Sequence, residues 1–166
     1  MAKSLARITK MEQIIIRKAI HTDLPILLEF EQGVIRAERP FDKTLREGDD
    51  LQYYDLKGMI DADHVQLLVA VAGTELVGSG YARIEASKSY LRHQQHAYLG
   101  FMFVRADFRG FGVNKLIIDG LKNWCKEKGI TELRLDVYDQ NSAAIKAYEK
   151  VGFKKHMIEM RFGLED

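Results

Sequence analysis

This chain has a single cysteine and almost no net charge, and both features restrict its function. Among 166 residues there is one cysteine, Cys125, so no disulfide can form within the chain and a reducing, cytoplasmic setting fits. The formal net charge of +1 gives no electrostatic case for binding nucleic acid or an anionic membrane. No apolar run approaches the roughly 20 residues that a membrane-spanning helix needs. We therefore expect neither nucleic acid nor a membrane among its partners.

The composition is that of an ordinary globular protein, with 46% hydrophobic and 30% charged residues. The length suits one domain with a sizeable core. We expect residues 13–166 to form this domain and residues 1–12 to be a flexible lead-in. The lead-in has Lys and Arg but no apolar segment after them, so it is not a secretion signal. The five histidines lack the compact spacing of metal ligands, and no metal site is expected.

Hydrophobic periodicity predicts strands and helices in alternation, without repeats or linkers. Alternating or β-branched apolar residues indicate strands, and apolar residues three and four apart indicate helices. Gly78 and Gly80 within one strand suggest a bulge or a close approach of another backbone. This order predicts an α/β or α+β domain with a mixed sheet. The predicted strands are residues 14–20, 65–72, 76–84, 98–104, 133–137 and 153–162, and the predicted helices begin at Thr22, within 50–61, at Val113 and at Asn141.

A glycine-rich turn between a predicted strand and an amphipathic helix is the most informative local feature. Glycines allow positive φ and a close approach of a ligand to the backbone. The first turn of the helix leaves N–H groups that favour an anion, most often a phosphate. Arg105, Arg109 and Lys115 add positive charge around the turn, whose sequence is Arg109-Gly110-Phe111-Gly112-Val113-Asn114.

Two glycines before a helix can also be no more than a sharp turn, so other anion sites have to be compared. A P-loop would need a Lys-Ser or Lys-Thr pair after the glycines, and none follows. A dinucleotide-binding fold would need a βαβ unit leading into the turn, and the first half of the chain shows none. It would also need an acidic residue that closes a following strand, for which Asp136 is the available candidate. The pattern therefore favours a pyrophosphate held by backbone amides in another architecture.

Two motifs in the C-terminal half resemble those of the GNAT superfamily of N-acetyltransferases. The acetyl-CoA motif of that family is Gln or Arg, two residues, Gly, one residue, then Gly or Ala. It is similar to Arg109, Gly112 and Asn114, and Val104 matches the valine that closes the preceding strand. Further along the chain, residues 141–153 resemble the family's closing pattern of Asn, then Ala, then Tyr-Glu-Lys and Gly-Phe.

The resemblance implies a GNAT-like α/β (α+β) fold, a single domain with a mixed, mostly antiparallel central sheet flanked by helices. It implies that strands 98–104 and 133–137 splay apart and that acetyl-CoA lies between them. An amine then attacks the thioester directly, and a strand-edge N–H stabilises the oxyanion. Homodimers are common in that family and are an open expectation here. The residues implied to bind acetyl-CoA are Phe103, Val104, Arg109, Gly110, Phe111, Gly112, Val113, Asn114, Asn141 and Tyr148.

Tyr148 is the implied catalytic residue. A thiol titrates near about 8.5 and a tyrosine near about 10, so Tyr148 is protonated at neutral pH and can donate to the departing thiolate. Its helical spacing also permits a core aromatic. Asn114 departs from the family's Gly or Ala, and its side chain can either crowd a pyrophosphate oxygen or donate to it. We expect binding to survive because the loop amides do most of the holding.

The general base is not assigned by the sequence. Many family members use a Glu on the strand before the glycine turn, but residues 97–104 include no carboxylate. His96, Tyr98 and Glu85 are the nearest polar candidates. His96 suits a base by its ordinary pKa, and a solvated loop histidine is the alternative.

The acceptor is predicted to be an amine of a small molecule or a peptide. Acidic and aromatic residues in the first two helices and their connection would suit a cation, although solvated helix faces explain them equally well. These residues are Glu31, Glu38, Asp42, Tyr53 and Tyr54. A non-catalytic, CoA-binding regulatory domain of the same fold is the alternative function.

Overall fold

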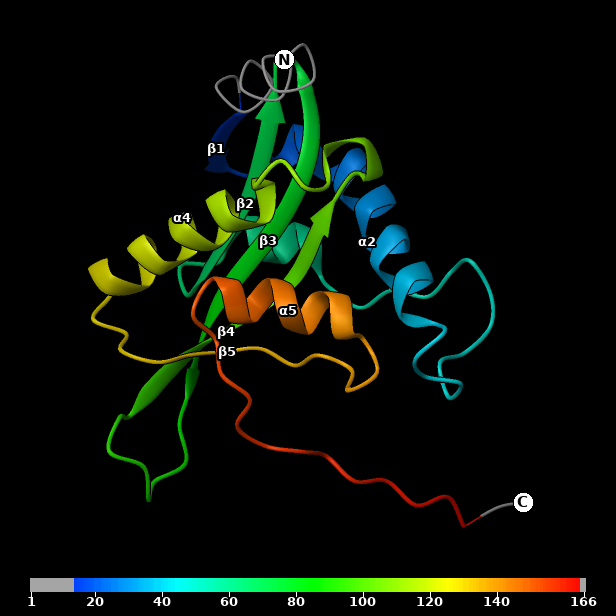
Figure 1. Ribbon diagram of the computed structural model, residues 1–166. Helices are drawn as coiled ribbons and strands as arrows, with labels where there is room; N and C mark the ends of the chain where they lie inside the picture. The colour runs from blue at the N-terminus through cyan, green and yellow to red at the C-terminus, as the bar shows by residue number, and fades with distance from the viewer. Residues whose placement is uncertain (1–13, 165–166) are drawn as a thin grey trace, which may run out of the picture.

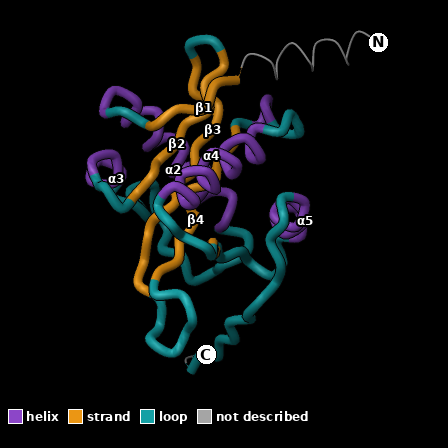
Figure 2. Tube along the Cα trace, turned by 90° about the vertical axis from the view of Figure 1, so that its left-hand side faces the viewer, coloured by secondary structure: helices purple, strands orange, loops and turns teal. Residues whose placement is uncertain are grey.

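The computed structural model describes residues 14–164 as a five-stranded sheet between two layers of helices (Figure 1). Helix α4 (Val113–Glu127) covers one face of the sheet. Helices α2 (Leu24–Glu38) and α3 (Leu56–Asp61) cover the other face. Helix α5 (Ser142–Lys150) stands apart from the strands, as the turned view shows (Figure 2). The predicted lead-in, residues 1–12, lies outside the described residues.

The strands lie in the sheet in the order in which they occur along the chain. The first four pair antiparallel, and the fifth joins the fourth in parallel. The predicted mixed, mostly antiparallel sheet is therefore confirmed. The strands are β1 (Ile14–Lys18), β2 (Val65–Ala72), β3 (Glu75–Ala86), β4 (Gln95–Val104) and β5 (Leu133–Arg134).

Alternating side chains of β2 build the two cores. Leu67 and Val69 pack with α2 and α3, whereas Leu68 and Ala70 pack with α4. This is the period of two that places successive strand residues on opposite faces. Helix α4 presents its apolar stripe to the sheet, with Ile117 fully buried. Burying one such side chain contributes roughly 1.5–3 kcal/mol.

Strand β4 has a bulge opposite Gly80, where Phe101 and Met102 face this one residue of β3. Phe101 has a φ of 55°, which is uncommon for a bulky residue. The buried Ser79 hydroxyl donates to the Phe101 carbonyl over 3.1 Å. A Cβ on Gly78 would lie 2.9 Å from the Phe103 carbonyl oxygen, so the expected bulge and the expected close approach of another backbone are both present.

Strands β4 and β5 separate soon after they meet. Their ladder has two residue pairs, Ala97 with Leu133 and Tyr98 with Arg134. The Ala97 N–H also donates to the carbonyl of residue 132 over 2.9 Å. Beyond Tyr98, in the described part of the chain, no ladder joins β4 to residues 135–139. The predicted pair of splayed strands is therefore present.

Several expected elements differ from the structure. The strand predicted at residues 153–162 is wrong, because this segment forms no ladder and has no regular structure. Alternation of apolar and polar side chains shows that a segment suits a strand, but it does not show that another strand lies beside it to form hydrogen bonds. The helix predicted within 50–61 is confined to α3, which begins where the Asp55 carboxylate accepts from the Gly58 N–H over 3.0 Å. Strand β5 ends at Arg134 because pairing with β4 ends there.

Candidate functional site

Helix α4 begins at a turn in which two glycines have left-handed backbone. Gly110 has a φ of 79°, and Gly112, the N-cap residue, has a φ of 80°. The first bond within the helix runs from the Leu116 N–H to the Gly112 carbonyl over 3.1 Å. The N–H groups of residues 113–115 have no intrahelical acceptor, as in the first turn of any helix. Gly112 has no side chain that could accept from them instead. This is the backbone geometry that suits an anion.

The positive side chains around this turn have different partners. Arg105 and Lys115 form ion pairs with nearby carboxylates, which neutralise them. Arg109 donates its Nε–H to the Val104 carbonyl over 3.2 Å and braces the turn against the end of β4. Within the described residues Arg109 forms no ion pair, so its charge stays available beside the turn.

A cavity of about 90 Å³ lies where β4 and β5 separate. The bulge of β4 forms one wall of this cavity. Beyond the short ladder, the edge of β4 that faces β5 has backbone groups with no strand beside them, which suits an extended ligand. The lining residues are Val34, Glu38, Tyr54, Tyr98, Leu99, Gly100, Phe101, Met102, Leu135, Asp136 and Tyr148.

Tyr148 brings a phenol from α5 to this cavity. Burial, with a smaller contribution from the negative charge of Glu38, raises its pKa to about 12. The phenol therefore keeps its proton at neutral pH. Its ring packs edge-on against Phe153 with centroids 6.0 Å apart, which holds the end of α5 in place. Tyr148 is half-buried and belongs to neither of the two main cores, so it is not simply a core aromatic.

Asn141 caps α5, because its Oδ1 accepts from the Ala144 N–H over 3.1 Å. The side-chain NH₂ remains as a donor. The far end of α5 is joined to α4, where Lys122 Nζ donates to the Val151 carbonyl over 2.6 Å. The two matched sequence motifs therefore lie on two helices that are linked to each other.

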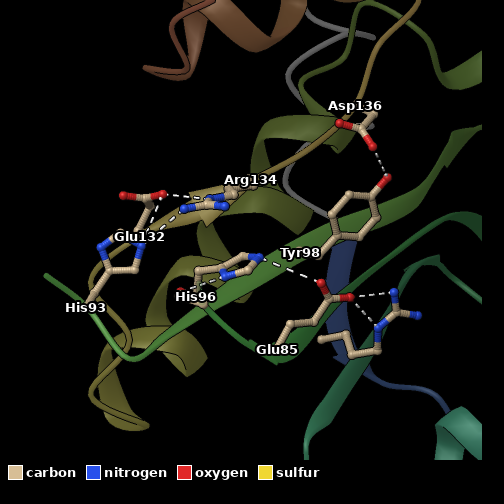
Figure 3. Close-up of polar contacts among 9 residues, drawn as sticks. Glu85, His93, His96, Tyr98, Glu132, Arg134 and Asp136 are labelled. Atoms are coloured by element: carbon tan, nitrogen blue, oxygen red, sulfur yellow. Dashed lines mark hydrogen bonds and ion pairs between the residues drawn. The ribbon is translucent and has the colours of Figure 1, made fainter. Parts of the chain in front are cut away.

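Two carboxylates, Glu38 and Asp136, line the same cavity as Tyr148. Burial raises the pKa of Glu38 at the end of α2. Asp136 accepts a hydrogen bond from the Tyr98 hydroxyl over 3.2 Å, across the splay of the two strands (Figure 3). Asp136 was missed as a site residue, although its place within the predicted strand 133–137, one of the two strands expected to splay apart around acetyl-CoA, was a signal. The cavity thus combines phenol donors with carboxylate acceptors.

His96 belongs to β4 and is buried, so the expectation of a solvated loop histidine is wrong. Its Nδ1 lies 2.9 Å from Ser87 Oγ, and its Nε2 lies 3.6 Å from the Glu85 carboxylate (Figure 3). Burial, and then the charge of Arg134, lower its pKa. Neither His96 nor Glu85 lines the cavity, so both act in the β3–β4 hairpin.

An open cavity of about 510 Å³ lies between α2 and the segment that leads into α3. Tyr54 lines both cavities. The fully buried Glu31 holds this segment, because its Oε1 accepts from the Tyr53 and Tyr54 N–H groups at 2.8 and 2.9 Å. Asp42, also expected near the acceptor, lines neither cavity. The larger cavity is lined by Leu24, Leu28, Gln52, Tyr53, Tyr54, Asp55, Leu56 and Lys57.

The remaining expected cofactor residues end β4 and begin α4. The Phe103 ring stacks on Phe30 with centroids 4.6 Å apart, so its side chain belongs to the core and its backbone alone can meet a ligand. Val104 pairs with Gly78 and is half-buried. Asn114 is half-buried on the first turn of α4, at the position where its side chain can contact an anion.

Other chemistry has no support at this site. Cys125 is buried in the core under α4, and burial raises the pKa of its thiol to about 11, as suits the packed cysteine that was expected. Among residues 14–164, no three His, Cys, Asp or Glu side chains are grouped to hold a metal ion. In the same range, no helix has the length and apolar content to cross a membrane.

Comparisons with known proteins give a consistent likeness. Residues 33–153 match the family model described as the acetyltransferase (GNAT) family. An aminoglycoside N(6′)-acetyltransferase type 1 from Salmonella typhimurium is 27% identical over 110 residues, which are 64% of this chain and 74% of that protein. An acetyltransferase from Pectobacterium atrosepticum is 30% identical over 100 residues, which are 60% of this chain and 65% of that protein.

Solved structures show the same fold. A mutant of a Bacillus halodurans protein superimposes with a TM-score of 0.81 at 21% identity, covering 91% of this chain and 99% of that one. The aminoglycoside acetyltransferase AAC(6′)-Iy, in complex with the bisubstrate analogue CoA-S-monomethyl-acetylneamine, has a TM-score of 0.70 at 23% identity. That match covers 92% of this chain and 99% of the other.

Proposed function

Because this chain belongs to the GNAT acetyltransferase family, we propose that it acetylates an amino group of a small, polycationic, aminoglycoside-like molecule. The family makes the protein an acyltransferase with acetyl-CoA as its donor. The observation that carries the proposal is the meeting of Tyr148, Glu38 and Asp136 in one cavity between splayed strands. Carboxylates there suit a cationic amine, and the names of the relatives favour an aminoglycoside. A non-catalytic domain is not favoured.

Acetyl-CoA is proposed to lie between the start of α4 and the opening of the sheet. The amides of the turn 109–114 would hold its pyrophosphate, with the Arg109 charge beside them. Its pantetheine arm would follow the edge of β4 beyond Tyr98, where no strand pairs with β4. The Asn141 NH₂ would donate to the arm from the other side, since its oxygen is occupied by the cap of α5.

The reaction needs one proton to move from the amine to the thiol. The neutral amine attacks the thioester carbonyl, and a β4 backbone N–H stabilises the oxyanion. The C–S bond then breaks as the N–C bond is completed, and Tyr148 donates its proton to the departing thiolate. Its pKa of about 12 keeps the phenol protonated until that step. The nitrogen of the addition intermediate loses a proton that restores the phenol, the earlier proton taken from the ammonium ion is released to water, and the products are an N-acetyl amine and CoA.

Glu38 is proposed as the general base. A free alkylamine titrates near about 10.4, so it arrives as a cation and must lose a proton before it attacks. Glu38 shares the cavity with Tyr148, and its raised pKa makes it a better proton acceptor than an ordinary carboxylate. Asp136 is instead tied to the Tyr98 hydroxyl, and would attract the cationic acceptor.

An amine panel tests the proposed acceptor class. We expect CoA release with aminoglycosides that carry a 6′-amino group, and much slower release with 6′-hydroxyl analogues, simple polyamines and peptide N-termini. The 6′-hydroxyl analogues are the matched control, because only the attacking atom differs. CoA release with peptide N-termini alone would mean that the acceptor is a peptide and not an aminoglycoside. Bound acetyl-CoA without turnover on any amine would contradict the proposal.

Replacing Glu38 with Gln separates its catalytic role from its effect on stability. We expect kcat/KM to fall by about 10² and the acidic limb of the pH profile to disappear. The folded-state pKa of Glu38 lies above its ordinary 4.5, so stability falls as pH rises from that value through the folded pKa. The variant should therefore unfold at a slightly higher temperature at neutral pH. Asp136→Asn is the comparison variant, and a larger loss there would assign the base to Asp136.

A further inference from the structure

Residues 39–55 connect α2 to α3 without regular secondary structure, and side chains of α2 hold them in place. This connection loops away from the end of α2 and returns to α3 (Figure 1). Gln32 Nε2 donates to a carbonyl of the connection over 2.8 Å. One oxygen of Glu31 accepts from the N–H groups of both Tyr53 and Tyr54. The last part of the connection is therefore fixed against the middle of the helix.

Glu31 is a costly side chain for this position. It is fully buried, and its second oxygen, Oε2, has no hydrogen-bond partner among the described residues. Burying a carboxylate with an unpaired oxygen costs more than burying an apolar side chain of similar size. The stability of the fold alone therefore does not explain a carboxylate here, and the segment that it holds needs a separate role.

Tyr53 has the other buried polar side-chain atom that lacks a hydrogen-bond partner in the described range. Its hydroxyl lies close to the Glu38 carboxylate without completing a hydrogen bond to it. Burial raises the pKa of Glu38, and the phenol of Tyr53 opposes part of this rise. Burial, and then the negative charge of Glu38, raise the pKa of Tyr53. The phenol therefore keeps its proton and faces the carboxylate as a donor.

The position of Tyr53 is fixed at both its backbone and its ring. Glu31 and Glu38 lie two turns apart on one face of α2, because seven residues complete nearly two turns. Tyr53 is bound at its backbone by the first of these carboxylates and approaches the second with its hydroxyl. Its ring packs edge-on against Tyr54 with centroids 5.8 Å apart, and Tyr54 packs against Phe101 in the bulge of β4. The hydroxyl is thereby kept beside Glu38.

Other polar groups near Glu38 have partners elsewhere. The Tyr138 hydroxyl donates to the Asp42 carboxylate over 3.5 Å. The Arg39 guanidinium donates to two carbonyls of the connection, at 2.9 and 2.6 Å. Of the groups that the structure describes, Tyr53 is the one whose contact lowers the pKa of Glu38. The remaining titratable groups around Glu38 are Tyr54, Asp136 and Tyr148.

We propose that Tyr53 is a positioning residue for the general base: its hydroxyl donates to the Glu38 carboxylate during the reaction, and Glu31 holds Tyr53 in place for this contact. The bond keeps Glu38 ionised in a cavity where burial favours the protonated form. It also leaves the other carboxylate oxygen to accept the proton of the amine. This role deepens the proposed function and rests on Glu38 as its base.

Titration of the Glu38 carboxyl by NMR tests this contact without turnover. In protein labelled with ¹³C at the glutamate carboxyls, the Glu38 signal is the one lost in Glu38→Gln. We expect Tyr53→Phe to raise the pKa of Glu38 by about one unit, a tenfold change in its ionisation constant. Tyr138→Phe is the matched control, because it removes a nearby hydroxyl that is directed at Asp42. An unchanged pKa in Tyr53→Phe, or an equal rise in the control, would overturn the inference.

Two substitutions of Glu31 test how Tyr53 is held. Glu31→Gln keeps a side-chain oxygen that can accept from both N–H groups, so the pKa of Glu38 should stay near its native value. Glu31→Leu removes the acceptor and should raise the pKa of Glu38 as Tyr53→Phe does. A folded Glu31→Leu variant with the native pKa at Glu38 would contradict the part of Glu31. If circular dichroism shows that Glu31→Leu is unfolded, the Tyr53→Phe titration still decides the inference.

The pH profile of kcat/KM separates this role from a structural one. Its acidic limb reports the pKa of the base, so in Tyr53→Phe the limb should move about one unit to higher pH while the plateau above it remains. A structural role would instead lower the plateau and leave the limb in place. A limb that stays although the titration shifts would mean that Glu38 is not the base, and would contradict the part of Tyr53 in the reaction. CoA release by the native protein tests the proposed function separately.

Discussion

Replacing Tyr148 with Phe should lower kcat about 100-fold or more and leave the dissociation constant of acetyl-CoA nearly unchanged. The substitution removes one hydroxyl from a cavity wall and keeps the ring that packs against Phe153. The departing thiolate then has no proton donor, whereas the contacts of the turn 109–114 with the pyrophosphate are untouched. Pre-steady-state CoA release and a fluorescence titration with acetyl-CoA measure the two quantities separately.

Tyr90→Phe is the control for this experiment. Tyr90 is 76% exposed, lies at the β3–β4 hairpin and lines neither cavity. It should leave both constants unchanged. If Tyr148→Phe weakens acetyl-CoA binding as much as it slows turnover, Tyr148 is a binding residue and its role as the acid is wrong.

Replacing Gly112 with Ala should weaken acetyl-CoA binding by roughly tenfold. Gly112 has a φ of 80°, and a residue with a Cβ loses about 1–2 kcal/mol in this region of backbone space. The turn relieves that strain by rotating, which directs the amides of α4 away from the pyrophosphate. About 1.4 kcal/mol of lost binding energy corresponds to tenfold in affinity. Isothermal calorimetry with CoA and acetyl-CoA measures the change.

Gly129→Ala supplies a control with matched strain. Gly129 has a φ of 73° at the other end of the same helix, and a Cβ there would meet nothing within 4 Å. The thermal midpoint should fall in both variants, but affinity should fall in Gly112→Ala alone. An equal loss of affinity in the two would mean that α4 acts through its general stability, and the backbone cradle would have to be abandoned.

Features that depend on local backbone chemistry could be predicted from the sequence. Gly110 and Gly112 indicated a left-handed turn before α4, and Gly80 indicated the bulge, although the extra residue lies on the partner strand. Features that depend on which edges meet could not be predicted. Residues 153–162 have the period of a strand but form no ladder, and His96 joins β4 because it pairs with Glu85 across the hairpin.

The candidate site divides along the same line. Asn141 and Tyr148 could be proposed as site residues because they belong to one short motif, and Tyr148 does line the cavity. Glu38 and Asp136 are far apart in the chain and share a cavity only because β4 and β5 diverge beside the end of α2. No pattern in a single sequence reports that distance. The sequence correctly showed that residues 97–104 have no carboxylate that could act as the base. The carboxylates that could take this role come from other elements.

The two-pair ladder between β4 and β5 also affects how the protein is held together. Helix α5 has no fully buried residue, and it follows a strand with a single short junction to the rest of the sheet. Segments with so little burial open at a free energy well below that of global unfolding. A cofactor that contacts α4, β4 and α5 would connect α5 to the rest of the sheet, where the β4–β5 ladder is too short to do so. Occupancy by acetyl-CoA and order in the helix of Tyr148 would then rise together, so that the proton donor is held most firmly when there is a thioester to cleave.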